Sequence, residues 1–314
     1  WILSPEFRPT PVGADTPETW VVIWTHALEV ISVFLWVFCL YYFAYRPYRR
    51  EGKLTWDGLF TMAAATLYIQ DPLLNYTTYW CAYSANFVNW GAWTTKFPGW
   101  MTPKGNLIPE APLAWGGAYT WYIVFPTLAG CWGLKKIKER YAQIGIVPLI
   151  ICAYIFYIFL NLATEGSFVF TRLYAFPSSI PSLTLFYGEV YQFPIYESFV
   201  WGGMWTAFCF IRYMRDDKGL SFSERGLEQL KLGERSRTFV RWLALVGLVQ
   251  TTMLVFYCVP IQFFAMHGGD FPANMPSYLM AGVCGEGTDY DCPGSVTPIP
   301  KFDSPTNRIA LPTE

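Results

Sequence analysis

The sequence predicts an all-α membrane protein that crosses the bilayer several times. Hydrophobic residues make up 53% of its 314 positions and charged residues only 14%, well below the roughly 25% of an ordinary soluble domain. Six apolar stretches are long enough to cross about 30 Å of hydrocarbon as helices. The segments that connect them alternate between strongly basic and nearly uncharged. We therefore predict a polytopic helical protein with long, aromatic-rich outer loops.

The predicted spans cover residues 20–45, 59–80, 112–134, 146–165, 192–213 and 239–266. A further span before Trp1 would make seven helices. Residues 1–267 are expected to form a single helical membrane domain. Residues 268–314, rich in Gly and Pro, are expected to form a separate tail.

The connecting segments predict the orientation in the membrane. Basic residues cluster between spans one and two, three and four, and five and six, whereas the other connections hold few. The positive-inside rule places the basic segments in the cytoplasm and the carboxy-terminal tail outside. The sequence thus predicts a multi-pass plasma-membrane protein. Its net charge of −1 gives no indication of a nucleic-acid partner.

Two of the eight cysteines, Cys284 and Cys292, lie in the outer tail rather than in an apolar span. An extracytoplasmic location favours a disulfide between them. No further Cys or His lies near them in the tail, so they do not predict a metal site.

Polar residues within the spans concentrate toward the predicted outer side. Ionisable groups in a membrane are costly and usually face a cavity or a partner. The candidates come from five spans and the segment before the fifth: His26, Glu29, Gln70, Asp71, Asn75, Asn161, Glu165, Glu189, Tyr191, Gln192, Tyr196, Glu197, Gln250, Gln262 and His267.

Each candidate has a structural alternative. Glu165, Glu189 and His267 are also consistent with solvated headgroup positions, and His26 with a local pair to Glu29, three residues along one helix face. The outer tryptophans are mostly typical of interfacial anchors.

Asp71 and Glu197 carry the strongest functional prediction. Each lies next to apolar residues and a proline-disturbed backbone, with no Lys or Arg beside it in sequence. Burial would leave each carboxyl able to exchange a proton near neutral pH.

Two histidines are too few for a histidine-rich di-iron centre. They allow at most one bis-imidazole haem or a mixed carboxylate–histidine site. The sequence holds no phosphate-binding loop, nucleotide fingerprint or nucleophile elbow. It also lacks the paired broken helices and inverted repeat of a transporter. We predict neither a metal nor an organic cofactor.

Several short runs resemble one family. They are Arg46-Pro47-Tyr48-Arg49-Arg50, Trp56-Asp57-Gly58-Leu59, Gln70-Asp71-Pro72, Phe97-Pro98-Gly99-Trp100-Met101, Tyr191-Gln192-Phe193-Pro194-Ile195-Tyr196-Glu197, Glu224-Arg225-Gly226, Phe256-Tyr257 and Pro260-Ile261-Gln262. Their order is similar to that in the avermectin-type (AveC-like) spirocyclase family of actinobacterial membrane proteins. The resemblance implies a biosynthetic cyclase that closes a dihydroxy-ketone into a spiroketal.

Acid–base catalysis on a lipophilic hydroxy-ketone fits both the carboxyl groups within the apolar spans and the resemblance to the spirocyclase family. We expect Asp71 and Glu197 to be the catalytic pair, with His26 and Glu29 relaying or orienting protons. The substrate-binding set is expected to be Asn75, Trp80, Trp100, Glu165, Tyr191, Gln192, Tyr196 and Gln262. Two alternatives use the same pocket: a non-catalytic lipid- or isoprenoid-binding subunit of a larger membrane complex, and a terpene-cyclase-like enzyme.

Overall fold

Three long helical columns form much of the periphery of the bundle. A computed structural model describes residues 1–100 and 105–280; Cys284 and Cys292 lie outside the described residues. The columns are α1–η1–α2 (Thr19–Cys39, Leu40–Tyr45 and Arg46–Glu51), α6 (Ile146–Phe170) and α8–η9–α9 (Glu234–Met253, Leu254–Cys258 and Val259–Met266). All three are long and apolar enough to span a membrane, which indicates a membrane protein.

The other three predicted spans are also helical, but they are shorter or more polar. They correspond to α3–η2–α4 (Trp56–Ala64, Ala65–Gln70 and Asp71–Thr77), η5–α5 (Pro112–Gly116 and Gly117–Arg140) and α7 (Ile195–Tyr213). Nearly all of α3 is buried, and α5 ends in a charged turn. Among the described residues, these helices do not meet the length and hydropathy expected of a span. The helices were therefore predicted correctly, whereas membrane crossing is indicated for three of the six.

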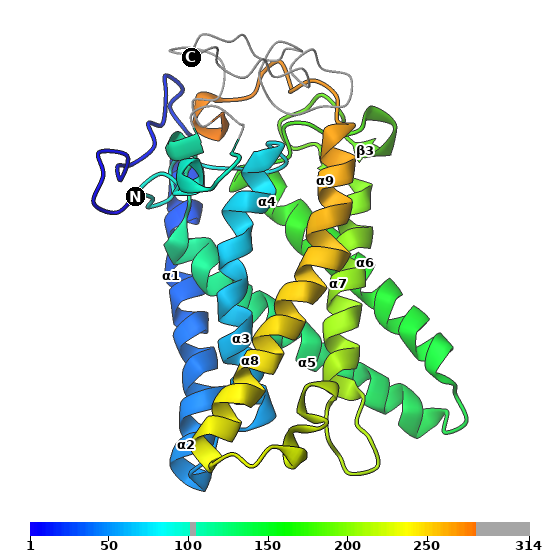
Figure 1. Ribbon diagram of the computed structural model, residues 1–314. Coiled ribbons are helices and arrows are strands. Elements are labelled where there is room, and N and C mark those ends of the chain that lie inside the picture. The colour runs from blue at the N-terminus through cyan, green and yellow to red at the C-terminus, as the bar shows by residue number, and fades with distance from the viewer. Residues whose placement is uncertain (101–104, 281–314) are drawn as a thin grey trace.

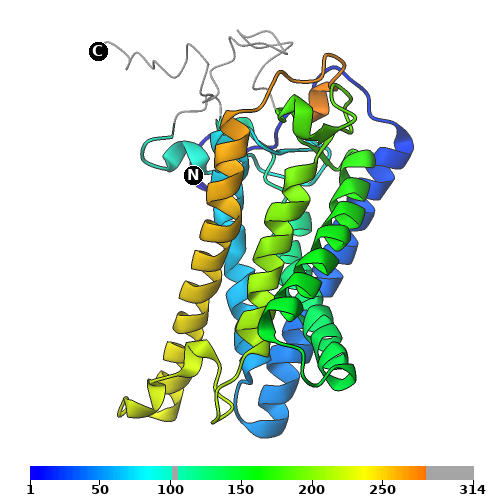
Figure 2. The same cartoon turned by 90° about the vertical axis from the view of Figure 1, so that its right-hand side faces the viewer.

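The basic connections gather at one end of the bundle, as Figures 1 and 2 show for α2, the α5–α6 turn and the α7–α8 connection. The amino-terminal segment and the end of α9 lie at the opposite end. We call these the basic end and the cap end.

The connections at the cap end form an ordered cap. Strand β1 (Ala82–Tyr83) pairs with β2 (Tyr174–Ala175), and β3 (Thr184–Leu185) pairs with β4 (Phe193–Pro194), both antiparallel. The amino-terminal segment joins the cap where the Thr10 amide donates to Asn89 (2.8 Å). Because these loops bond to one another, they hold the helix ends in fixed positions.

Prolines and irregular turns interrupt the helices near the bundle centre. Pro126 lies inside α5 and cannot donate to the carbonyl of Tyr122. That carbonyl instead accepts a hydrogen bond from the Trp205 indole N–H (3.0 Å). Pro72 is the second residue of α4, which follows the 3₁₀ segment η2, and Pro260 is the second residue of α9, which follows the π-helical segment η9. Such irregular segments are frequent at functional sites.

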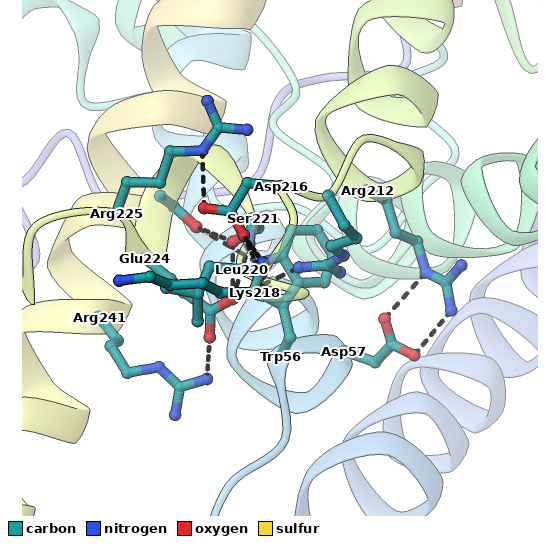
Figure 3. Close-up of polar contacts among 12 residues, drawn as sticks. Trp56, Asp57, Arg212, Asp216, Lys218, Leu220, Ser221, Glu224, Arg225 and Arg241 are labelled. Carbon is teal, nitrogen blue, oxygen red and sulfur yellow. Dashed lines mark hydrogen bonds and ion pairs between the residues drawn. The ribbon is translucent and has the colours of Figure 1, made fainter. Parts of the chain in front are cut away.

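At the basic end, charged groups are paired (Figure 3). Arg212, in the last turn of α7, donates from Nε and Nη2 to the two carboxylate oxygens of Asp57 in α3, at 2.9 Å each. Arg215 lies 4.9 Å from the centre of the Trp56 ring. These contacts tie the end of α7 to the start of α3.

The α7–α8 connection is also folded. Ser221 and Glu224 form a capping box at η7 (Phe222–Glu224), and Glu224 accepts from Arg215 (3.4 Å) and Arg241. Arg241 belongs to α8, so this carboxylate joins the connection to the following helix.

Candidate functional site

Carboxyl groups from three helices border one small cavity toward the cap end. Its volume is about 50 Å³, room for a few water molecules. The lining residues come from α4, β1, β2, η5, α5, α6, α7 and η9: Asp71, Asn75, Cys81, Tyr83, Trp115, Ala118, Tyr119, Tyr122, Ile123, Glu165, Tyr174, Phe176, Glu197, Trp201 and Tyr257.

Asp71 is the most heavily bonded carboxyl of the cavity. It begins α4 directly after the 3₁₀ segment, and its side chain is fully buried. Its Oδ1 accepts from the hydroxyl groups of Tyr119 (2.6 Å) and Tyr83 (2.8 Å) and from Asn75 Nδ2 (3.0 Å). Its Oδ2 is buried with no hydrogen-bond partner, so one oxygen is fixed and the other is available for chemistry.

Glu197 likewise has one carboxyl oxygen with a hydrogen-bond partner and one without. It lies in the first turn of α7, where the helix dipole favours negative charge. The Tyr257 hydroxyl, from the π-helical segment η9, donates to its Oε1 (2.8 Å), whereas Oε2 is buried without a partner.

Glu165 is the third carboxyl, near the end of α6. One turn earlier, Asn161 accepts from the Ser198 hydroxyl (2.9 Å), which ties α6 to α7 beside Glu197. The α6–α7 contact therefore fixes two of the three carboxyl-bearing helices relative to each other.

The remaining wall is mainly aromatic. The rings of Tyr83 and Trp115 stack with centroids 5.1 Å apart, and Trp201 packs against Tyr257 at 4.9 Å. No Lys, Arg or His is among the described residues that line the cavity. Three carboxyls without a cation in such surroundings would be costly to hold fully ionised, which suits groups that share protons with each other or with a ligand.

Asp71, Asn75, Glu165 and Glu197 are the predicted residues that the fold brings together here. His26 and Glu29 bond to each other (2.8 Å) away from it. The His26 side chain is 50% exposed, and Glu29 also accepts from the Val88 amide (2.6 Å). This pair therefore joins α1 to the cap.

Gln192 and Gln262 have structural bonding partners instead of facing the cavity. Gln192 Nε2 donates to the carbonyl of Phe176 (2.7 Å), and Gln262 Nε2 donates to the carbonyl of Leu74 (2.6 Å). Gln192 thus satisfies a backbone carbonyl of the cap, and Gln262 links α9 to a backbone carbonyl of α4.

The predicted aromatic residues do not line the cavity. Trp80 packs on Phe176 and on Tyr196, with centroids 4.9 and 5.4 Å apart. Tyr191 packs against Phe170 (5.6 Å), and the Trp100 amide donates to Phe97 in a turn (3.2 Å). Trp80 and Tyr196 thus support the wall from behind.

Sequence reasoning missed four tyrosines of the cavity, of which Tyr83 and Tyr119 donate to Asp71 and Tyr257 donates to Glu197. Tyr119 and Tyr122 are three residues apart in α5, on one helix face, and both line the cavity with Tyr83 and Tyr257. The three-residue spacing of Tyr119 and Tyr122 within the predicted span 112–134 was the sequence feature that could have identified them.

The described part of the chain assembles no metal site. In residues 1–100 and 105–280, no three His, Cys, Asp or Glu side chains are grouped so as to hold a metal ion.

Comparison with known proteins identifies the family. A family model described as spirocyclase AveC-like matches residues 49–279, a range that contains every residue lining the cavity. The chain belongs to the AveC-like spirocyclase family. Membership in the AveC-like family supports a cyclase role and confirms the resemblance found in the short sequence runs. No curated protein and no solved structure matches the chain.

Proposed function

We propose that this AveC-like protein is a membrane-embedded cyclase that converts a lipophilic dihydroxy-ketone into a spiroketal by acid–base catalysis. The observation that carries the proposal is the shared cavity of Asp71, Glu165 and Glu197. Two of these carboxyls keep a buried oxygen without a partner, in a chain whose family is named for spirocyclisation.

Spiroketal formation requires an acid and a base on opposite sides of the ketone carbon. The acid protonates the ketone oxygen while the base removes the proton of the first attacking hydroxyl, which forms a hemiketal. The base, which now carries a proton, returns it to the hemiketal hydroxyl, which leaves as water. The second hydroxyl attacks the oxocarbenium carbon and gives its proton to the deprotonated acid, which restores both groups. The net reaction is dihydroxy-ketone to spiroketal plus water.

The hydrogen bonds suggest which carboxyl has which role. Asp71 accepts three hydrogen bonds, which stabilise a carboxylate, so we assign it the base. Glu197 accepts one from Tyr257 and is assigned the acid. Glu165 and the ring faces of Trp115 and Trp201 would stabilise the cationic intermediate.

The cavity must widen to admit such a substrate. Its volume of about 50 Å³ is below the roughly 300–1,000 Å³ of typical ligand pockets. Substrate binding would therefore move lining side chains and expel water, which strengthens the electrostatic contacts with the oxocarbenium carbon.

The decisive assay follows water loss and stereochemistry with a synthetic lipophilic dihydroxy-ketone and purified protein in nanodiscs. We expect one spiroketal stereoisomer to form faster than in protein-free nanodiscs. Asp71→Asn and Glu197→Gln should insert and fold but lose this excess, whereas Glu189→Gln, an exposed carboxyl in the cap, should retain it. Normal turnover by either cavity variant would remove that residue from the mechanism. An unreacted lipid that co-purifies with an inactive wild-type protein would instead support the lipid-binding alternative.

A further inference from the structure

A second pocket lies in the cap, apart from the three-carboxyl cavity. Its volume is about 300 Å³, the lower end of the range for small-molecule sites. Its wall contains rings from the amino-terminal segment, η2 and the 78–111 connection: Trp1, Phe7, Tyr68, Trp90 and Trp93.

Glu110 carries the only carboxyl group among the described side chains of this wall. It is 5% exposed. Its Oε2 accepts from the Tyr68 hydroxyl (2.9 Å), whereas its Oε1 is buried with no hydrogen-bond partner. A buried carboxyl oxygen without a partner is costly, so a ligand that pairs with it gains the energy of satisfying it.

No positive side chain is available to this carboxyl within the described lining. The nearby loop cation Lys96 pairs instead with Glu6 (3.0 Å). The pocket thus combines electron-rich rings with one carboxyl group and, among its described lining residues, no Lys, Arg or His side chain, the arrangement that recognises organic ammonium ions through cation–π contacts.

We propose that the Glu110 pocket binds an organic ammonium cation, with the aromatic rings around the substituted nitrogen and the Glu110 carboxylate as its counter-ion. A quaternary lipid headgroup and a free quaternary amine share this chemistry. The site is spatially distinct from the cyclase site proposed above, because the two linings share no residue.

The backbone holds the rings in place. Trp90 stacks on Phe7 with centroids 5.8 Å apart and planes 5° from parallel, and the Trp90 carbonyl accepts from the Arg8 amide (3.2 Å). Gly91 follows with φ +71°, where an added Cβ would lie 2.2 Å from the Asn106 carbonyl oxygen. Only glycine suits this turn, which sets the direction of the chain between Trp90 and Trp93.

Ionisation of Glu110 gives the site a characteristic pH dependence. Burial, and then the negative charge of Asp71, raise the pKa of Glu110 well above its ordinary value despite the Tyr68 hydrogen bond. A cation prefers the ionised carboxyl, so its binding releases a proton and tightens as pH rises toward that pKa. A neutral ligand that accepts a hydrogen bond from the protonated acid would weaken over the same range.

Choline provides a direct probe, with 3,3-dimethylbutan-1-ol as its uncharged isostere. We expect choline to bind the full chain in phosphatidylglycerol nanodiscs, measured by calorimetry, and to bind more tightly at higher pH. Glu110→Gln should weaken choline binding about tenfold or more, and Trp90→Leu by several-fold. Trp90→Phe keeps a ring and should be intermediate, and Glu189→Gln should bind like the wild type.

Phosphatidylcholine nanodiscs identify the source of the cation. A weaker apparent affinity for added choline there would assign the pocket to a lipid headgroup, and an unchanged affinity would assign it to a free amine. Equal binding of the isostere, tighter binding at low pH, or undiminished binding by Glu110→Gln would each overturn the proposal.

Discussion

Carboxyl groups at the basic end and in the three-carboxyl cavity have opposite surroundings. At the basic end, Asp57 is held by both arms of Arg212, and Glu224 is held by Ser221, Arg215 and Arg241 (Figure 3). In the three-carboxyl cavity, Asp71 and Glu197 are more deeply buried, yet no cation borders them in the described lining and each keeps one oxygen unpaired.

This difference separates structural charges from charges that do chemistry. A paired carboxylate at a helix end fixes the adjoining connection and needs nothing further. An unpaired buried carboxyl reduces stability, and its retention is reasonable if it gains a partner only when a substrate binds. Substitutions in the cavity are therefore expected to reduce turnover, whereas substitutions at the basic end are expected to reduce stability.

The strongest contrast comes from Asp71→Asn. We expect turnover of the dihydroxy-ketone to fall by roughly 10²–10⁴-fold, the typical contribution of one acid–base group, because an amide cannot take up the hydroxyl proton. The free energy of unfolding should be unchanged or higher, because the amide removes a buried charge. Turnover and thermal melting of the same nanodisc sample provide both measurements.

Arg212→Leu should lower stability and leave turnover nearly unchanged, which is the reverse of the result expected for Asp71→Asn. Asp57 would lose both hydrogen bonds while partly buried, which should lower the free energy of unfolding by about 2 kcal/mol. Turnover per folded molecule should remain near the wild-type value, because the pair lies at the other end of the bundle. Asp57→Asn combined with Arg212→Leu should cost less than the sum of the two single variants. Additive losses would contradict a direct pair.

Tyr119→Phe tests the support of a cavity carboxyl. It removes the shortest of three hydrogen bonds to Asp71 Oδ1 and leaves two donors, so we expect turnover to fall about fivefold to tenfold, equivalent to roughly 1 kcal/mol. The pH–rate profile should shift on its Asp71 limb, which a purely structural defect would not cause. Tyr187→Phe, on an exposed ring, is the matched control. An unaltered profile would show that Tyr119 has no influence on Asp71.

The helices could be predicted from the sequence because a long apolar run with few charges favours a helix over a strand or a loop. Their interruptions were less evident. The structure confirms a break beside Pro72, but the π-helical segments η5 and η9 have no distinct sequence pattern. The helix α8 begins at Glu234, earlier than predicted, because its first turns are charged and extend beyond the apolar run.

The site was partly predictable for a related reason. A carboxyl within an apolar stretch is conspicuous, so Asp71 and Glu197 stood out, whereas Glu165, near the end of its span, was also consistent with a solvated headgroup position. A tyrosine is not conspicuous in a chain with 19% aromatic residues, so only the fold reveals that Tyr119 donates to Asp71. Gln192 differs from these carboxyls, because its amide donates to a backbone carbonyl and does not line the cavity.

The smallest effect is expected from Glu224→Gln at the basic end. Burial alone would raise the pKa of Glu224, but hydrogen bonds from Ser221 and the charge of Arg241 outweigh burial and hold the pKa below its ordinary value. A lowered pKa in the folded state contributes stability above the unfolded pKa, and this contribution disappears as pH falls through the folded pKa. Near neutral pH the variant should therefore be less stable than the wild type by about 1 kcal/mol, and the two melting curves should converge below about pH 4. A difference in melting that persists at acid pH would mean that Glu224 acts by packing, and the distinction between paired and unpaired carboxyls would then lose its support at this position.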